Sequence, residues 1–222
     1  MISVILITHN YEKYIENCLN SILSNNNSFV GEIIIVNDSS EDNSEQIINK
    51  YLANPKIKYF YVKFKSLSKS YNFGIKKSNF PLITKVDADD LLESNFFDDY
   101  FKELKIKNYD LIFGNLKIVD ENVNIIKVKT QNKELIGSKF FYPVGSGTIY
   151  KKKIWEQIGG FDERLNYQDD YDFWLRINKI RNIKLGAINK SAYKYRMHSL
   201  NMSKNLIKKN LSKIYVFLKN LI

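Results

Sequence analysis

The sequence predicts an α/β protein in which helices cover both faces of a central, mainly parallel β-sheet. Three observations predict this class. Four short apolar runs rich in β-branched residues are typical of buried strands, amphipathic helical segments lie between them, and three of the runs end in clusters of polar residues. Alternating strands and helices form βαβ units, which pair their strands in parallel.

The first half of the chain supplies the parallel strands and the helices that connect them. Strands are expected at Ser3–Thr8, Glu32–Val36, Ile57–Val62 and Leu82–Val86. The first helix presents an apolar face of Ile15, Cys18, Leu19, Ile22 and Leu23, the second opens with a capping box of Asp42 and Glu45, and the third is short and follows a loop at Lys63–Ser70. Because the first strand, Ser3–Thr8, is apolar throughout, the sheet should be covered on both faces.

The second half mixes helices with an antiparallel hairpin. Helices are expected at Asn95–Leu104, Lys151–Ile158 and Gln168–Ile180, and strands at Tyr109–Val119, Val123–Lys129 and, with a kink, Phe140–Tyr150. Gly159 and Gly160 end the second helix, and Asp169, Asp170 and Asp172 lead the third. No linker separates these elements, so residues 1–203 are expected to form one domain.

Composition places the chain among folded proteins and limits its partners. The 222 residues suffice for one sizeable core, and 44% hydrophobic against 26% charged residues excludes a disordered chain. The single cysteine, Cys18, excludes an intrachain disulfide. A formal net charge of +10 favours anionic partners, namely nucleotides, nucleic acid or acidic lipid headgroups. No base-reading motif is present, so we expect no nucleic acid partner.

Two further features bear on localisation. The chain opens as a strand and not as a signal peptide, and no apolar run reaches the ~18–20 residues that span a bilayer. We therefore expect a cytoplasmic protein, or one attached peripherally to the inner face of the cell membrane. The second option rests on the segment Lys204–Ile222, which reads as a basic amphipathic helix with an apolar stripe of Ile207, Leu211, Ile214 and Leu218. The alternative contacts of that stripe are a membrane surface, a partner or second copy, and its own domain.

The acidic stretch Asp87-Ala88-Asp89-Asp90 directly follows the fourth expected strand. Three carboxylates within four residues repel one another, so a hard cation such as Mg²⁺ or Mn²⁺ is expected between them. Ligands of open α/β sheets bind at the carboxyl ends of the strands, where Thr8-His9-Asn10 and Asn37-Asp38-Ser39-Ser40 also lie. The three clusters should therefore face one crevice that holds a metal and a diphosphate. The alternative is a solvated acidic turn that caps the next helix.

Six short motifs, each weak alone, occur in an order and spacing typical of one enzyme family. They are Ser3–Tyr11, Ile35–Asp42, Val86–Asp90, Gly159–Glu163, Asp169–Asp172 and Tyr195–His198. Through them the chain resembles the family 2 glycosyltransferases from about Ser3 to Ser203. The resemblance implies a GT-A (Rossmann-like) fold and an inverting, metal-dependent hexosyl or hexosaminyl transfer from a nucleoside-diphosphate sugar, usually a UDP-sugar. It also implies a hydroxyl acceptor, a glycan or lipid-linked acceptor of surface polysaccharide or glycolipid biosynthesis.

The resemblance assigns an expected role to each matching residue. Nucleotide-binding residues are Thr8, His9, Asn10, Asp38, Asp87 and Lys69. Metal ligands of the D-x-D region and the late loop are Asp89, Asp90 and His198. Donor or acceptor contacts are Gly145, Ser146, Gly147, Asp169 and Arg196. Asp170 is the general base, and the roles divide the domain into a nucleotide-binding half at 1–92 and an acceptor-binding half at 93–203, followed by the helix at 204–222.

The chain departs from the family pattern at four positions. Asn37, Ser39 and Asp169 replace the usual Asp, Gly and Glu, which we expect to be tolerated. Tyr71 stands where an arginine is common, which leaves Lys69 or Lys65 as the cation for the diphosphate.

The expected chemistry depends on the ionisation of Asp170. A base that takes the proton of the acceptor hydroxyl contributes typically ~10²–10⁴-fold. Like charge from Asp169 and Asp172 raises the pKa of Asp170, whereas the helix N-terminus lowers it, and the sequence leaves the balance open. Two other classes remain. One is a nucleotidyltransferase, against which the absence of glycine in Thr8–Tyr14 argues, and the other is a non-catalytic sugar-nucleotide-binding or scaffold protein.

Overall fold

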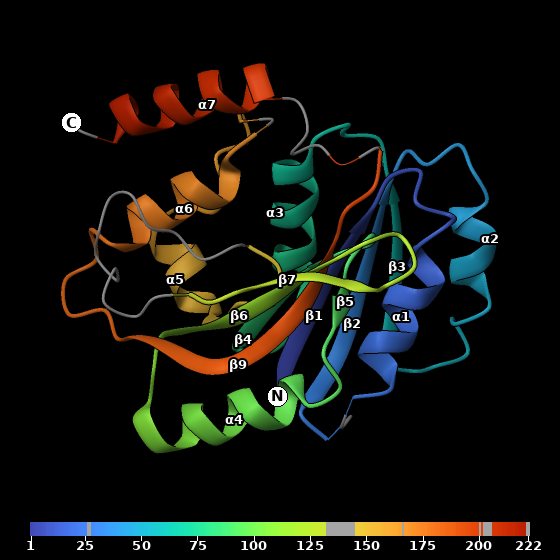
Figure 1. The fold of residues 1–222 in the computed structure, drawn as a ribbon, viewed down its shortest axis with the longest axis horizontal. Coiled ribbons are helices and arrows are strands. Elements are labelled where there is room, and N and C mark those ends of the chain that lie inside the picture. Colours follow the sequence, from blue (N-terminus) through green and yellow to red (C-terminus); the bar gives the residue numbers. More distant parts are fainter. Residues whose placement is uncertain (26–27, 132–144, 166, 200, 202–205, 221–222) are drawn as a thin grey trace.

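A computed structural model describes residues 1–25, 28–131, 145–165, 167–199, 201 and 206–220. The described strands are β1 (Ile2–Thr8), β2 (Val30–Asp38), β3 (Ile57–Val62), β4 (Leu82–Asp87), β5 (Leu91–Leu92), β6 (Leu111–Val119), β7 (Ile125–Lys129), β8 (Ile149–Lys151) and β9 (Leu185–Arg196). The described helices are α1 (Ile15–Leu23), α2 (Ser44–Asn49), α3 (Leu67–Lys77), α4 (Phe96–Lys107), α5 (Lys152–Gln157), α6 (Asp169–Ile177) and α7 (Leu206–Lys219). One curled central sheet carries helices on both faces, which confirms the predicted fold class (Figure 1).

Four parallel strands form one side of the sheet, in the order β3-β2-β1-β4. Successive side chains of β1 enter opposite cores, as the pleat of a strand requires. Val4 and Leu6 pack with residues of α1, α2 and α4, whereas Ile5 and Ile7 pack with residues of α3, α5 and α6. Because both faces are covered, a continuous apolar sequence is the one that suits these strands.

The polar ends of the parallel strands lie level with one another. Thr8 of β1 is opposite Asn37 of β2, and Ile7 is opposite Asp87 at the end of β4. Neighbouring strands are about 4.8 Å apart, so the residues that follow these strands gather at one edge of the sheet. This edge is the position that the sequence predicts for the site.

The other side of the sheet is mixed. β8 runs antiparallel to both β4 and β6, and β9 runs parallel to β6. The hairpin of β6 and β7 is confirmed, whereas β5 and β9 were not predicted. In β9 the polar residues Asn189 and Lys190 interrupt the apolar pattern, and the pairing with β6 shifts register at the same place. Of the kinked strand expected at Phe140–Tyr150, residues 140–144 lie outside the described residues.

Two helix starts differ from the sequence prediction. α3 begins inside the expected loop, because the Ser66 hydroxyl accepts a hydrogen bond from the Lys69 amide at 3.4 Å and so caps the helix. The predicted capping box before α2 is wrong. Asp42 instead accepts hydrogen bonds from the amides of Glu12, at 2.8 Å, and Ser44, at 3.0 Å.

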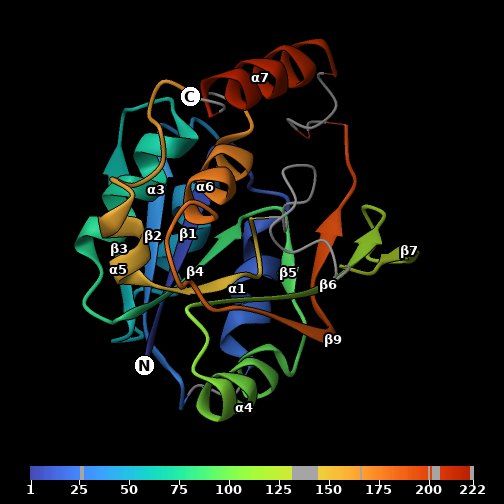
Figure 2. The same cartoon turned by 90° about the vertical axis from the view of Figure 1, so that its left-hand side faces the viewer.

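The C-terminal helix α7 lies across α6 at one end of the molecule, as both views show (Figures 1 and 2). Its Val216 side chain is fully buried against Leu165, Tyr171 and Leu175. The helix therefore packs on its own domain, through a face that does not include the apolar stripe expected from the sequence. No helix in the described part of the chain has the length and apolar character needed to cross a membrane.

Candidate functional site

Asp87, the last residue of β4, is held by side chains from two other parts of the chain. The Tyr71 hydroxyl of α3 donates a hydrogen bond to Asp87 Oδ1, and the Ser146 hydroxyl donates to Oδ2 at 2.7 Å. Burial, and then the charge of Asp87, raise the pKa of Tyr71, which keeps its hydroxyl protonated as a donor. Tyr71 thus orients the carboxylate of Asp87 at the end of β4.

Asp89 pairs with His198 from the far end of the chain. His198 Nε2 lies 2.9 Å from Asp89 Oδ2, and Asn201 Nδ2 donates to the same oxygen at 3.4 Å. Both side chains are buried, and the imidazole ring packs on Tyr14 with 4.6 Å between ring centroids. Tyr11 contacts the same imidazole edge-on at 5.9 Å. The aromatic contacts fix the imidazole beside the carboxylate.

Asp90 and Arg196 connect the acidic turn to the end of β9. The Arg196 amide donates to Asp90 Oδ1 at 3.0 Å, and its Nε donates to the Asp89 carbonyl at 2.9 Å. Burial, and then the charges of Asp89 and Asp87, raise the pKa of Asp90 well above its ordinary value. The Arg196 guanidinium is itself buried and donates through Nη1 to the Glu121 carbonyl at 2.7 Å, while Nη2 meets no hydrogen-bond partner among the described residues.

These residues would suit a divalent cation only if a bound ligand completed its coordination. The like charges of the turn favour a cation, and Asp89 and His198 place one oxygen and one nitrogen ligand side by side. Within the described residues, no three His, Cys, Asp or Glu side chains are grouped so as to hold a metal by themselves. Mg²⁺ usually takes one or two protein carboxylates and fills its other positions with substrate phosphates and water. The Mg²⁺ or Mn²⁺ site therefore stays a prediction that requires the diphosphate.

The ends of β1 and β2 are tied together by polar contacts. His9 Nδ1 lies 2.6 Å from the carbonyl oxygen of Asp38, and the Asn10 amide donates to Ser40 Oγ at 3.0 Å. Asn10 has a left-handed backbone, with φ of 57°, which asparagine tolerates better than most residues. Thr8 is buried, and its hydroxyl has no hydrogen-bond partner in the described structure. A ligand atom at this strand end would satisfy that hydroxyl.

Asp38 holds the segment that leads from β3 into α3. Its carboxylate accepts hydrogen bonds from the amides of Phe64, Lys65 and Ser66 at 2.8, 2.8 and 3.0 Å, and from the Ser70 hydroxyl at 2.8 Å. The carboxylate oxygens are therefore already used by the protein, and the predicted contact of Asp38 with the nucleotide stays a prediction. Lys69 lies exposed on the first turn of α3, which Asp38 positions through these bonds.

Asp170 lies in the first turn of α6, beside the buried Asp169. Its Oδ1 accepts a hydrogen bond from the Tyr171 amide at 2.8 Å. Burial, and then the charge of Asp169, raise the pKa of Asp170 to about 6, while Lys85 and the amide act in the opposite direction. The balance that the sequence leaves open therefore favours a raised pKa. A carboxylate with a pKa near neutrality is suited to general base catalysis.

The third acid of the α6 start, Asp172, is fully buried and has a structural role. Its Oδ2 lies 2.7 Å from Arg176 Nη2, and its Oδ1 lies 2.8 Å from Lys219 Nζ of α7. Two cations therefore compensate its charge. This arrangement separates Asp172 from the other two acids of the helix start.

Lys85 is a candidate functional residue that the sequence reasoning missed. The residue is buried in β4, and its Nζ lies 3.7 Å from Asp169 Oδ2. The same ammonium lies over the aromatic rings of Tyr71 and Phe161, at 4.2 and 4.7 Å from their centroids. A lysine inside an otherwise apolar strand was the available signal, because a buried ammonium needs an anion nearby.

The turn before β8 joins the two groups of acids. A Cβ atom at Gly145 would lie 2.9 Å from Lys85 Nζ and 3.3 Å from Asp170 Cβ. Gly147 has φ of 69°, and a Cβ there would lie 2.6 Å from the Tyr193 ring. Gly147 therefore requires glycine, whereas a Cβ at Gly145 would press on the end of the Lys85 side chain. Between these two glycines, the Ser146 hydroxyl donates a hydrogen bond to Asp87. One short turn therefore lies next to both Asp87 at the end of β4 and Asp170 at the start of α6.

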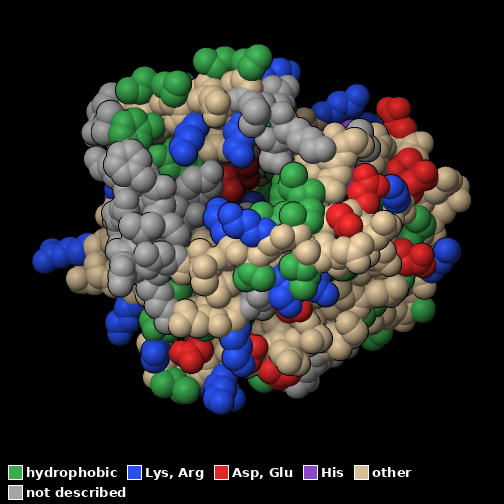
Figure 3. All heavy atoms as spheres, in the orientation of Figure 1, with side chains coloured by type: hydrophobic (Ala, Val, Ile, Leu, Met, Phe, Trp, Pro, Cys, Tyr) green, Lys and Arg blue, Asp and Glu red, His purple; other side chains and the backbone are tan. Residues whose placement is uncertain are grey.

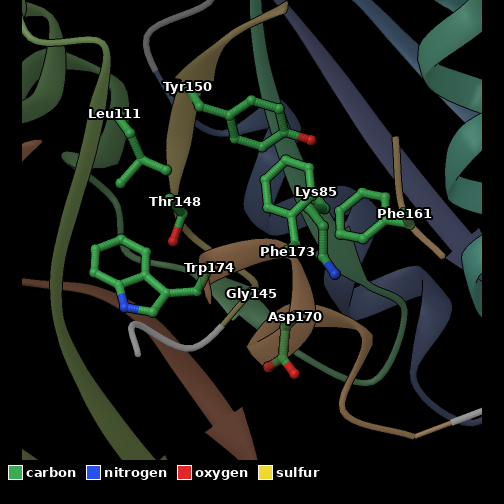
Figure 4. Close-up of a pocket in the computed structure, with 9 residues that line it drawn as sticks. All are labelled: Lys85, Leu111, Gly145, Thr148, Tyr150, Phe161, Asp170, Phe173 and Trp174. Carbon is green, nitrogen blue, oxygen red and sulfur yellow. The ribbon is translucent and has the colours of Figure 1, made fainter. Parts of the chain in front are cut away.

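A pocket lies next to this turn (Figure 4). Its polar groups include Lys85, Asp170 and Thr148, and its apolar wall is formed by Leu111, Gly145, Tyr150, Phe161, Phe173 and Trp174. Figure 4 shows Asp170 on the α6 helix, with Gly145 close to it. The structure therefore brings Asp87, Gly145, Ser146, Asp169 and Asp170 together, as the sequence predicts.

Comparison with known proteins gives relatives of one kind. The family model described as Glycosyl transferase family 2 matches residues 3–182. An uncharacterized glycosyltransferase of Rickettsia conorii is 28% identical over 221 residues, which cover 95% of this chain and 36% of that protein. The O-antigen biosynthesis glycosyltransferase WbnJ of Escherichia coli is 25% identical over 216 residues, which cover 93% of this chain and 84% of WbnJ.

A solved structure shares the fold. The structure of S. aureus TarS in complex with UDP-GlcNAc superposes with a TM-score of 0.78 and 21% sequence identity, over 92% of this chain and 60% of the TarS chain. The present chain thus spans only part of TarS, as it does of the Rickettsia protein.

Proposed function

The chain belongs to glycosyl transferase family 2, and we propose that it transfers a sugar from a UDP-sugar to an acceptor hydroxyl with inversion at the anomeric carbon. We propose surface polysaccharide or glycolipid biosynthesis as its setting, because WbnJ is named for O-antigen biosynthesis. UDP is proposed as the nucleotide because the TarS chain that shares the fold was solved with UDP-GlcNAc.

The observation that carries this proposal is the environment of Asp170. Its carboxyl group has a pKa raised to about 6, lies at the wall of a pocket, and is linked through the turn at 145–147 to the strand-end acid Asp87. At neutral pH the group is mainly ionised yet remains a better proton acceptor than an ordinary aspartate. A general base needs this combination.

In the proposed reaction, Asp170 accepts the proton of the acceptor hydroxyl as its oxygen attacks the anomeric carbon. The bond from that carbon to the diphosphate oxygen breaks in the same step, and its electron pair leaves with UDP. A single displacement with the base opposite the leaving group inverts the configuration at the anomeric carbon. The charges of Lys85 and Asp169 set the pKa of the base from opposite directions. The aromatic wall of the pocket excludes water from the base.

The donor is proposed to bind at the ends of the parallel strands. Thr8, His9 and Asn10 would line the nucleotide wall, where the buried Thr8 hydroxyl has no partner in the described structure. Asp87 would contact the ribose or a metal-bound water. Asp38 would act mainly by fixing the segment before α3, which carries the exposed Lys69 towards the nucleotide side.

The metal is proposed to bind at Asp89 and His198, with Asp90 supporting the turn from inside the protein. When bound, Mg²⁺ or Mn²⁺ would neutralise the charge that develops on the leaving diphosphate. Arg196 would add a second positive charge at the same turn, because its buried guanidinium adjoins the Asp89 carbonyl. Gly145, Ser146, Gly147 and Asp169 would border the donor sugar and the acceptor on the other side.

A matched pair of aspartate variants tests the proposal. In Asp170→Asn the base is lost while the side-chain shape is kept, and Asp98→Asn makes the same change at an exposed position in the first turn of α4. The assay is UDP release from a panel of UDP-sugars with Mn²⁺, alongside UDP affinity by calorimetry. We expect Asp170→Asn to release UDP at least ~10²-fold more slowly with unchanged UDP affinity, and Asp98→Asn to match the wild type.

The two ways in which this experiment can fail are distinct. Near-normal turnover by Asp170→Asn would remove this residue from the mechanism but leave the transferase standing. A wild-type protein that binds UDP but turns over no UDP-sugar, even with candidate glycan acceptors, would favour the non-catalytic alternative.

A further inference from the structure

The outer face of α7 is an exposed apolar stripe. Its large side chains are between 50% and 76% exposed, and they are Ile207, Leu211, Ile214, Tyr215 and Leu218. Their spacing places them on one side of the helix. Figure 3 shows apolar side chains along this edge of the molecule, with Lys or Arg side chains below them beside a hollow where acidic groups are visible. Single exposed apolar residues are ordinary, but a continuous stripe of five indicates a contact surface.

The opposite face of α7 is anchored to the domain. Val216 is buried in a small apolar cluster, and Ser212 Oγ donates to the Tyr167 carbonyl at 2.7 Å. Lys219 Nζ lies 2.5 Å from Asp162 Oδ2 and 2.8 Å from Asp172 Oδ1. Turning the apolar stripe inward would break these contacts and leave the buried Asp172 with one cation fewer. The stripe therefore stays on the outside of the folded domain.

The positive charge of α7 indicates which kind of partner binds this stripe. The described part of α7 carries lysines and no acidic residue, and Lys208 and Lys213 are exposed. The loop before α3, with exposed Lys63, Phe64 and Lys65, lies at the same end of the molecule (Figures 1 and 2). A second copy of α7 laid against the stripe would bring lysines close to lysines, which opposes association. An anionic lipid surface accepts both the apolar side chains and the surrounding positive charge.

We propose that the outer face of α7 docks on an anionic lipid surface, with the apolar stripe at the level of the headgroups and acyl chains and the lysines on the lipid phosphates. The helix then lies in the plane of the surface. Because α7 contacts Tyr167 and Asp172 at the two sides of the α6 start, docking holds the helix that carries Asp170 near the lipid. This orientation suits a lipid-linked acceptor, but the docking itself does not depend on the proposed function.

Vesicle flotation with matched double variants tests the proposal. The full chain is mixed with vesicles of phosphatidylcholine alone or with 30 mol% phosphatidylglycerol, at low and high salt. We expect binding to the anionic vesicles that weakens with salt, and little binding to the neutral ones. Leu211→Ser with Leu218→Ser should weaken binding by more than roughly tenfold, because buried CH₂ groups are lost from the lipid contact. Lys208→Gln should weaken it by roughly fivefold, whereas Lys213, whose Nζ lies 5.6 Å from the centroid of the Tyr171 ring beneath α7, is left unchanged.

The control removes a comparable apolar surface elsewhere. Ile126 and Val128 of β7 are 61% and 51% exposed, and Figure 2 shows β7 on another side of the molecule from α7. Ile126→Ser with Val128→Ser should bind vesicles as the wild type does. Since all the replaced side chains are exposed, the melting temperatures and UDP affinities should be unchanged.

Three results would overturn the proposal. The first is a wild type that floats with neither vesicle. The second is equal loss of binding in the α7 and β7 variants. The third is a dimer, measured by light scattering, that Leu211→Ser with Leu218→Ser converts to a monomer, because a second copy would then occupy the stripe. Each of these results leaves the test of Asp170 unaffected.

Discussion

Replacing Lys85 with methionine removes one charge from the pocket while keeping a side chain of similar length. In the wild type, Lys85 Nζ lies 3.7 Å from Asp169 Oδ2 and lowers the pKa of the neighbouring Asp170 against the effects of burial and of Asp169. The Cβ position of Gly145 lies 2.9 Å from Nζ and 3.3 Å from Asp170 Cβ, so Nζ and Asp170 Cβ are at most about 6 Å apart. Removing the ammonium should therefore raise the pKa of Asp170.

The size of the effect is taken from the range usual for an opposite charge beside a carboxyl group. An opposite charge at about 4–6 Å lowers the pKa of a carboxyl group by ~1–3 pH units. At the lower limit, the pKa of Asp170 rises from about 6 to about 7, and the ionised fraction at pH 7 falls from roughly 90% to roughly 50%. Donor turnover by Lys85→Met should thus fall about twofold or more at pH 7 and recover as the pH approaches 9.

The assay is the initial rate of UDP release from a UDP-sugar between pH 5 and 9. The rate should rise with pH in both proteins, because the base acts when ionised, but its midpoint should lie at least ~1 pH unit higher in Lys85→Met. Lys85→Arg keeps the charge and should keep the wild-type midpoint, and Lys76→Met, at an exposed position in α3, controls for loss of net charge. Equal midpoints in Lys85→Met and the wild type would refute the role given to Lys85.

Three further predictions concern stability. In the folded protein the pKa of Asp170 is about 6, above its ordinary value of 3.8, so ionising Asp170 lowers the stability of the fold as the pH rises from 4 to 7. Asp170→Asn should therefore increase the free energy of unfolding at pH 7 by up to about 3 kcal/mol. At pH 4 the increase should be small, and urea denaturation measures both values. Gly147→Ala should cost about 3 kcal/mol, since its φ is 69° and the new Cβ overlaps Tyr193, whereas Gly159→Ala, with φ of 75° and open space around it, should cost only about 1 kcal/mol. Asp38→Ala should cost about 3 kcal/mol and speed hydrogen exchange at the amides before α3, and slow exchange there would contradict the role of this carboxylate.

The parallel half of the fold could be predicted because its sequence signals are local. β1 is a nearly continuous apolar run, and β4 is one apart from Thr84 and Lys85; a strand buried on both faces favours such a run. The acidic turn after β4 was predicted in place, because the carboxyl ends of parallel strands meet at one edge. β9 was missed because Asn189 and Lys190 break its apolar pattern, and its pairing with the distant β6 overrides that interruption.

The parts of the site that could not be predicted depend on contacts between distant residues. Nothing in the neighbourhood of Lys85 in the sequence indicates that Asp169 will lie 3.7 Å away. Likewise, Asp38 was expected to meet a ligand, but the segment at 64–66 folds back and donates three amides to it. The face by which α7 packs was also unpredictable, because the partner of Lys219 is the buried Asp172 of another helix.

The stereochemistry of the first product tests the central claim most directly. Wild-type protein with Mn²⁺ is given an α-linked UDP-sugar, with water as the acceptor, and the anomeric proton of the released sugar is followed by NMR before the anomers equilibrate. A single displacement assisted by Asp170 predicts that the β-anomer appears first. Initial release of the α-anomer would contradict it, because retention requires a second displacement that this arrangement of acids does not supply.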